Sequence, residues 1–449
     1  MVYYTPMEQP GIEQRTISRI TWRLIPFMML CYLVAFIDRT NLGAAKLQMT
    51  QFDNQVYGFA AGIFFFGYFL FEVPSNLIME KVGARIWIAR IMIIWGFICA
   101  ATMFVGANKY AFYGVRFLLG VGEAGFFPGM ILYLTYWFPT RYRARTVALF
   151  MSAAALSGVV GNLLSGFIMK HMDHVLQLKG WQWLFILEGL PASLLGIVVF
   201  FYLPNGPRNA RWLAPEELAW LEGQLVGERA EREKHHHLTL RQALMNPKVL
   251  LLSVLYFMIV IGGYGPEFFM PAIIKDRTGW TDPVHITALA TVPSLVAAIV
   301  MVFFGRHSDK TGERRWHVFA ALSIGAAGLA VAALAKDPTV TMIGMCLAVS
   351  GRWCATSTFW GLPTAFLSGT AAAGGIAMIN SIGNLGGHFG PATMGWLRET
   401  TKSYTLGLFI LAVCFLAGAF LAVAVRIRKT ADATPTPPSA APSGSSSSG

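Results

Sequence analysis

Charged residues are scarce in this chain: Asp, Glu, Lys and Arg make up 13% of its 449 residues. A soluble globular protein carries about 25%, whereas 55% of the residues here are hydrophobic. The apolar runs are each about 20 residues or longer, which is the length of a membrane-spanning helix. The composition therefore excludes a soluble globular protein and predicts an all-α membrane protein.

Cysteine is also scarce, and all five cysteines lie within apolar runs. They lack the spacing of a metal site and do not stand in loops where an oxidising compartment would pair them. The sequence shows no phosphate-binding loop, nucleotide motif or nucleophile triad, so we expect neither an enzyme nor ATP-driven transport. We expect no metal and no cofactor. The first apolar run is too long for a signal-peptide core, so we expect no cleavable signal.

The apolar runs predict twelve transmembrane helices in two six-helix halves. Their approximate ranges are 22–44, 58–79, 86–106, 109–138, 145–169, 182–203, 248–275, 284–305, 316–335, 338–367, 371–397 and 403–427. The corresponding division of the chain is a cytoplasmic N-terminus at 1–21, a first half at 22–203, a cytoplasmic central loop at 204–247, a second half at 248–427 and a disordered tail at 428–449. An amphipathic helix is expected at 215–233, within the central loop.

Basic residues gather at alternate helix ends, as in Arg15, Arg19 and Arg23 before the first helix. This bias is the topology signal of membrane proteins, and it predicts that both termini and the central loop are cytoplasmic. The same explanation accounts for the net charge of +12, so we expect a lipid bilayer and no nucleic acid as partner. The histidine tract 235–237 is interpreted as part of a solvated loop. A monomer is expected.

A short motif occurs twice, at the same place in each predicted half. Glu80-Lys81-Val82-Gly83-Ala84-Arg85 follows the second helix, and Asp309-Lys310-Thr311-Gly312-Glu313-Arg314 follows the eighth. Both have the pattern acid-Lys-x-Gly-x-Arg. Recurrence at the matching helix indicates tandem halves, which is how many secondary transporters are built.

Longer motifs carry a resemblance to a known family. The first helix contains Asp38-Arg39-x-Asn41-x-Gly43, the fourth contains Arg116-Phe-Leu-Leu-Gly-Val-Gly-Glu123, and the tenth and eleventh contain Phe359-Trp360-x-Leu-Pro363 and Asn380-Ser-Ile-Gly-Asn384. Together with the repeated loop, these residues resemble the major facilitator superfamily and, within it, the anion:cation symporter family. The resemblance implies a cavity lined by the first, fourth, seventh and tenth helices, and proton-coupled movement of an organic carboxylate.

Six ionisable residues lie deep inside predicted spans, where a charge is costly and marks function. They are Asp38, Arg39, Arg116, Glu123, Glu267 and Arg352. The resemblance implies anion handling or gating for Arg39 and Arg116, and proton coupling for Asp38 and Glu123. Arg116 and Glu123 are two helical turns apart, so they share a face with roughly 10 Å between their levels. The alternative for these charges is that they hold helices together.

Glu267 and Arg352 depart from the family pattern, and two interpretations stay open. They form a gate salt bridge, or Arg352 provides a further anion contact that would suit a dicarboxylate. Tyr68 matches a family tyrosine at the cavity and is expected to donate to a substrate oxygen or to serve in packing. Glu72, closer to the cytoplasmic end, is expected to pair with a loop arginine.

The eleventh helix carries a polar stripe, because Asn380, Asn384 and His388 are spaced by four. Ser381 and Asn384 are candidates for binding substrate hydroxyls. His388 titrates near neutral pH when unperturbed, so it is a candidate for proton coupling, although a histidine packed in the core is the simpler interpretation. Trp360 is a candidate for stacking on a sugar acid or an aromatic acid.

These observations predict a proton-coupled symporter that imports a small hydroxylated organic anion, either a tartrate-like dicarboxylate or a sugar acid, across a bacterial inner membrane by alternating access. The alternative is an uncoupled facilitator, an exchanger or an exporter of organic anions, aromatic acids included. A membrane receptor or enzyme is disfavoured, because the central loop at 204–247 is too short for an added domain.

Overall fold

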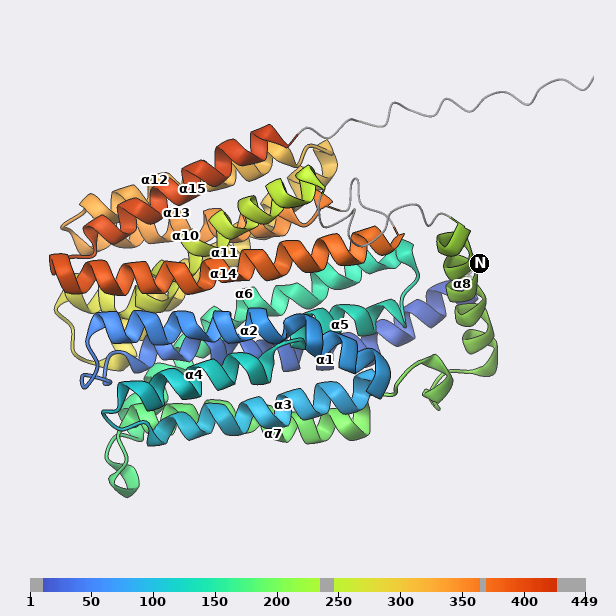
Figure 1. Cartoon of the computed structure of the whole chain (residues 1–449), viewed down its shortest axis with the longest axis horizontal. Helices are drawn as coiled ribbons and strands as arrows, with labels where there is room; N and C mark the ends of the chain where they lie inside the picture. The colour runs from blue at the N-terminus through green and yellow to red at the C-terminus, as the bar shows by residue number, and fades with distance from the viewer. Residues whose placement is uncertain (1–10, 235–245, 364–368, 426–449) are drawn as a thin grey trace, which may run out of the picture.

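The computed structural model describes residues 11–234, 246–363 and 369–425, and within them every regular element is a helix (Figure 1). The helices of the first half are α1 Ile12–Ala45, α2 Asn54–Val82, α3 Ala84–Ala101, α4 Lys109–Glu123, α5 Phe126–Thr135, α6 Thr140–His171 and α7 Gly180–Tyr202. Those of the second half are α10 Pro247–Thr278, α11 Pro283–Thr311, α12 Arg315–Leu334, α13 Pro338–Phe359, α14 Gly369–Thr401 and α15 Thr405–Ala424. The histidine tract and the predicted tail at 428–449 lie outside the described residues.

Each predicted span corresponds to one of these helices, with α4 and α5 together forming the fourth, so the predicted fold class is confirmed. Ten of the described spans are long and apolar enough to cross a membrane by length and hydropathy. The remaining two of the twelve are α13 and α14, which carry several Gly, Ser and Thr residues and, in α13, the buried Arg352. Within the described residues, neither of these two helices contains a stretch as apolar as those of the other ten spans.

The predicted amphipathic helix is α8, Pro215–Lys234, and it lies apart from the bundle beside the start of α1 (Figure 1). Proline at its first position and Glu216 and Glu217 in its first turn are typical of a helix start. Arg15 and Arg19 of α1 pair with these two glutamates at 2.5 and 2.8 Å. This contact explains why α1 begins well before the predicted residue 22. We call this side of the molecule the α8 end and the other side the opposite end.

The fourth span is broken directly after Glu123. Helix α4 ends there, Ala124 has extended backbone angles, and Gly125 has a φ of +87° before α5 begins. A residue with a Cβ is strained at positive φ, and a Cβ on Gly125 would also lie 2.3 Å from Ser75 Oγ of α2. The glycine therefore permits both the break and the close approach of α2. The break places Glu123 at the end of a helix, deep in the bundle.

The two halves pack against each other through α2 with α14, α6 with α11, and α1 with α10. The seam between α2 and α14 is made of small residues: a Cβ on Gly58 would lie 2.4 Å from Pro391 O, and one on Gly395 would lie 2.2 Å from Asn54 O. The two helices therefore approach each other closely at these glycines. Such surfaces let two helices slide or rock past each other.

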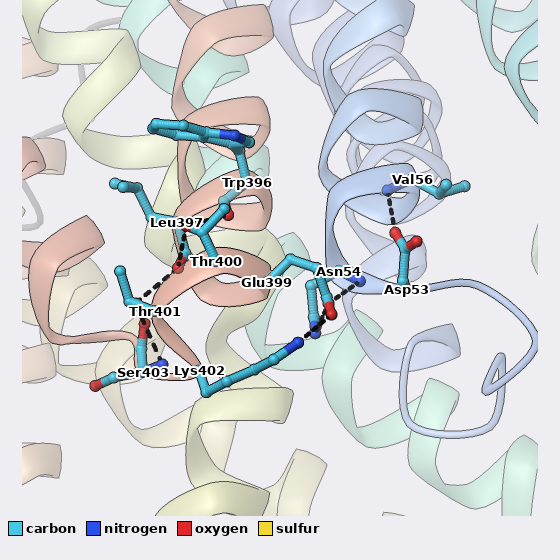
Figure 2. A network of polar contacts seen from close by, with 10 residues as sticks. All are labelled: Asp53, Asn54, Val56, Trp396, Leu397, Glu399, Thr400, Thr401, Lys402 and Ser403. Atoms are coloured by element: carbon cyan, nitrogen blue, oxygen red, sulfur yellow. Dashed lines mark hydrogen bonds and ion pairs between the residues drawn. The ribbon is translucent and has the colours of Figure 1, made fainter.

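The opposite end is closed by polar contacts between the halves, which we call the end latch. Figure 2 shows Asn54, at the start of α2, directed at Glu399 near the end of α14. Its backbone N and Nδ2 donate to that carboxylate at 3.2 and 3.0 Å. Lys170 of α6 pairs with Asp282 before α11 at 2.6 Å. The structure is therefore one in which the halves are joined at the opposite end.

Candidate functional site

The buried charges form two arginine–carboxylate pairs, one in each half. Arg39 on α1 pairs with Glu123 at the end of α4, and Arg352 on α13 pairs with Glu267 on α10. The first pair is buried on both sides, whereas the Glu267 side chain is 25% exposed. Two ions in a low-dielectric region stabilise each other only at close range. Each of these two pairs thus lies within one half.

Tyr264 of α10 connects the two pairs. Arg39 Nη1 donates to its hydroxyl oxygen at 3.4 Å, and Arg352 Cζ stands 4.2 Å from the centre of its ring. The ring also packs against Phe65 of α2 at 4.6 Å. We call the five residues Glu123, Arg39, Tyr264, Arg352 and Glu267 the arginine network. It runs from one half to the other, and sequence reasoning did not single out Tyr264.

Arg116 on α4 is fully buried, and none of its guanidinium nitrogens has a hydrogen-bond partner among the described residues. Its nearest aromatic neighbour is the Phe64 ring, 5.3 Å from Cζ, and it is within electrostatic reach of Glu123 and Arg39. Glu123 instead bonds to Arg39. A buried guanidinium with unfilled donors is costly, and it is suited to receive an anion or water.

Asp38 faces the interior of the first half, on a different side of α1 from Arg39. Its Oδ2 accepts from Trp95 Nε1 at 2.8 Å, and its Oδ1 has no partner among the described residues. Glu188 of α7, which the sequence analysis did not single out, lies within electrostatic reach of Asp38 and accepts from Ser165 at 2.8 Å. The first half therefore holds two buried carboxyl groups, Asp38 and Glu188, in addition to Glu123 of the arginine network.

Glu72 of α2 does not pair with a loop arginine, and that expectation is wrong. The carboxylate is buried, and it accepts from Asn380 Nδ2 at 2.5 Å and from Ser381 Oγ at 2.8 Å, both on α14 of the other half. Two neutral donors replace the expected cation. Ser381, a candidate for substrate hydroxyls, is occupied by Glu72 in this structure, and Asn384 lies buried one turn further along α14.

The remaining candidates are aromatic or lie at the edge of the bundle. Tyr68 is buried with its ring centre 5.4 Å from Arg39 Cζ, so it borders the arginine network. Trp360 packs edge-to-face on Tyr256, with ring centres 5.0 Å apart. His388 lies between the rings of the exposed phenylalanines Phe59, Phe66 and Phe389, so it is placed on the lipid-facing side of the seam, away from the network.

A small cavity between the halves borders the network. Glu267, Arg352 and Trp353 line it from the second half, together with Ser294 of α11, and Thr40 and Asn162 line it from the first half. Its volume is about 40 Å³, which is room for no more than a few water molecules. A substrate therefore requires the halves to separate further than they do here.

No group of three or more His, Cys, Asp or Glu side chains is placed to hold a metal within the described part of the chain. All five cysteines are free thiols. The candidate site thus consists of arginines, carboxylates, hydroxyls and aromatic rings. These groups can bind an anion and exchange protons while the carbon skeleton of the anion stays unchanged.

The sequence matches the family model of the Major Facilitator Superfamily over residues 28–391. A protein of Agrobacterium vitis named "Putative tartrate transporter" is 48% identical over 413 residues, covering 91% of each chain. A Pseudomonas putida protein named "Putative metabolite transport protein NicT" is 44% identical over 412 residues, covering 91% of this chain and 94% of the relative.

Solved structures agree on the fold. The Escherichia coli xylose transporter XylE, in a partially occluded inward-open conformation, has a TM-score of 0.74 at 15% identity, covering 90% of this chain and 97% of that one. The chain belongs to the Major Facilitator Superfamily, and it is a multi-pass membrane transporter rather than an enzyme.

Proposed function

We propose that this chain is a proton-coupled symporter of the anion:cation type that imports a small hydroxylated organic anion across a bacterial inner membrane. The observation that carries this proposal is the arginine network: each half holds one arginine–carboxylate pair, and the two pairs meet at Tyr264. The names of the relatives support a tartrate-like substrate, and a sugar acid has the same functional groups. The α8 end is taken as cytoplasmic from the distribution of basic residues.

The pairs provide a route for exchange between substrate and proton. A substrate carboxylate that binds an arginine displaces the carboxylate already there, because a guanidinium fork holds one carboxylate bidentately at a time. A carboxylate that loses its cation in a low-dielectric site binds a proton more readily. Glu123 would therefore take a proton from the outer solution when an anion occupies Arg39 or the unfilled donors of Arg116, and release it inside after the anion leaves.

The two arginines Arg39 and Arg352 would serve the two ends of a dicarboxylate. Arg39 of α1 contacts the hydroxyl of Tyr264 and Arg352 of α13 contacts its ring, so a substrate that bridges them also bridges the halves. Asp38 is proposed to hold a proton within the first half. Tyr68 and Trp360 are proposed to border the substrate, and Ser381 and Asn384 to bond to it once Ser381 parts from Glu72. His388 stays a candidate for proton transfer, but a less favoured one than Glu123 or Asp38.

The first prediction tests the coupling with protein reconstituted in liposomes. We expect the wild type to accumulate labelled tartrate when the outside is more acidic than the inside. Glu123→Gln should abolish this accumulation, because an amide does not carry the proton, and retain exchange of labelled for unlabelled tartrate. The matched control is Glu222→Gln on α8, which alters an exposed ion pair with Arg208. This variant should behave as wild type.

Accumulation by Glu123→Gln equal to that of the wild type would contradict the coupling role. Wild-type uptake that ignores the pH gradient would instead favour an uncoupled facilitator or exchanger. A thermal-shift panel of tartrates, aldonates, aldarates and aromatic acids separates the substrate classes, because a ligand that binds only the folded protein stabilises it more the further its concentration exceeds its Kd. Stabilisation by aromatic acids alone would overturn the hydroxylated class.

A further inference from the structure

The small cavity beside the arginine network has two walls of different chemistry. One wall holds the ion pair of Arg352 and Glu267. The other wall holds three neutral polar side chains from three helices: Thr40 of α1, Asn162 of α6 and Ser294 of α11. Neutral polar groups are infrequent on helix surfaces within a bilayer unless they serve packing or a ligand. The hydrogen bonds of these three side chains show which of their atoms are available.

Asn162 offers an acceptor to the cavity and no donor. Its Nδ2 donates to Gly158 O at 2.7 Å and to Ala290 O of α11 at 3.4 Å. An amide nitrogen has two protons, and both are directed at carbonyl oxygens, which fixes which end of the amide is nitrogen. Its Oδ1 has no partner among the described residues, so this oxygen is the group that remains for a ligand.

Thr40 is likewise left as an acceptor. Its hydroxyl donates to Phe36 O at 2.9 Å within α1, and a hydroxyl has a single proton. Ser294 has no hydrogen-bond partner among the described residues, so its hydroxyl can both donate and accept a hydrogen bond. The Ser294 side chain has room because residue 158 is a glycine: a Cβ on Gly158 would lie 2.6 Å from Ser294 Oγ. The wall is therefore rich in oxygen lone pairs and poor in protons.

At Asn162 and Thr40 such a wall favours an O–H group over a carboxylate. A carboxylate can only accept hydrogen bonds, so it finds no donor at Asn162 or Thr40, whereas an alcohol donates to either. The arginine on the facing wall has the opposite preference. The cavity thus separates two functional groups of one ligand: carboxylates toward the arginines, and hydroxyls toward Asn162, Thr40 and Ser294.

We propose that Asn162, Thr40 and Ser294 form a hydroxyl-recognition subsite that selects 2-hydroxy dicarboxylic acids over dicarboxylic acids without hydroxyls. This inference rests on the proposed function and adds to it the residues that read the hydroxyl groups. A ligand without hydroxyls would leave these buried acceptors without a hydrogen-bond donor, and this cost lowers its affinity. A site built to bond a hydroxyl discriminates against the analogue that lacks it more strongly than an apolar pocket discriminates by size.

The experiment uses three acids with the same four-carbon skeleton: tartrate, malate and succinate, with two, one and no hydroxyl groups. Each acid competes with labelled tartrate in exchange assays on the reconstituted full-length protein. We expect the wild type to prefer tartrate, then malate, then succinate. Asn162→Ala should reduce the ratio of tartrate to succinate affinity about tenfold, the loss of roughly one good hydrogen bond, because tartrate loses a bond and succinate no longer leaves this acceptor unpaired.

Two further variants separate recognition from folding. Thr40→Val keeps the shape of the side chain and should reduce the same ratio by a smaller factor, and Ser152→Ala, on the exposed face of α6, should not change it. An unaltered ratio of tartrate to succinate affinity in both Asn162→Ala and Thr40→Val overturns the subsite while the proposed function stands. If the wild type binds none of the three acids, the dicarboxylate form of the proposed function fails and the subsite with it. If Asn162→Ala does not fold, the affinity ratio measured for Thr40→Val alone tests the subsite.

Discussion

The arginine network at the centre and the end latch both join the two halves, but they join them by different means. In the network, each ion pair lies within one half, and the only hydrogen bond that crosses between halves runs from Arg39 to Tyr264 at 3.4 Å. In the end latch, every bond crosses directly, from Asn54 to Glu399 and from Lys170 to Asp282.

The two regions also differ in burial. The side chains of Arg39 and Glu123 are 10% and 3% exposed, whereas those of Lys170 and Asp282 are 47% and 25% exposed. A buried charge that loses its partner is strongly penalised, whereas an exposed one is solvated again by water. The network therefore keeps each half intact as a body, whereas the latch determines how long the opposite end stays closed.

The largest expected effect tests this difference in stability. Glu123→Ala should lower the free energy of unfolding by about 3–5 kcal/mol, because it leaves Arg39 without a carboxylate inside the bundle. Asp282→Ala, the matched change in the latch, should cost about 1 kcal/mol or less. Unfolding in denaturing detergent measures both. Equal losses in the two variants would contradict the distinction between a structural network and a releasable latch.

An intermediate effect is expected on the opening of the latch. Glu399→Gln removes the charge that accepts from both Asn54 nitrogens (Figure 2) and should favour the open opposite end by about 1 kcal/mol. Hydrogen exchange at residues 57–61 of α2 should then accelerate about fivefold. Lys402→Ala removes the other partner of Glu399 at 2.5 Å without touching α2, and should have less effect. Acceleration confined to Lys402→Ala would place the latch elsewhere.

The smallest effect is a pH dependence at the opposite end. Burial lowers the pKa of Lys46, which follows α1, to about 8, whereas a free lysine titrates near 10.4. Between these values the unfolded chain binds more protons, so stability rises with pH. Lys46→Met should be the more stable protein at pH 7, and its advantage should shrink above pH 8, by about 1 kcal/mol or less at pH 9. An advantage that stays constant from pH 7 to pH 10 would show that Lys46 is not desolvated.

The fold followed from the sequence because span length and basic-residue bias are local signals that the bilayer enforces. The pairing of Arg352 with Glu267 was one of the two interpretations that the sequence left open, whereas the bond between Arg39 and Glu123 did not follow from it. Spacing along α4 placed Arg116 and Glu123 on one face with roughly 10 Å between their levels, and it could not indicate which residue of α1 stands opposite Glu123. Successive residues of a helix point about 100° apart, so Asp38 and Arg39 face different neighbours. Which helix stands opposite each face is a tertiary fact with no local signal.

Two omissions have different causes. Glu188 is the sole acidic residue in the predicted span 182–203, so the rule that singled out Glu123 should have identified it too. Tyr264 carried no such signal, because a tyrosine in an aromatic-rich helix is usually a packing residue. Glu72 was assigned the wrong partner because its bonds to Asn380 and Ser381 come from the other half, where no spacing along α2 could indicate them.

The seam between α2 and α14 has a consequence for the divergence of this family. At Gly58 and Gly395 even one added methyl group would collide with backbone across the seam, so these surfaces cannot vary one residue at a time. The cavity wall at Thr40, Asn162 and Ser294 is formed by side chains of α1, α6 and α11, which lie outside this seam. Change of cargo and change of motion are therefore separable in evolution: a transporter can acquire a new substrate by altering the wall while it inherits the same rocking surface.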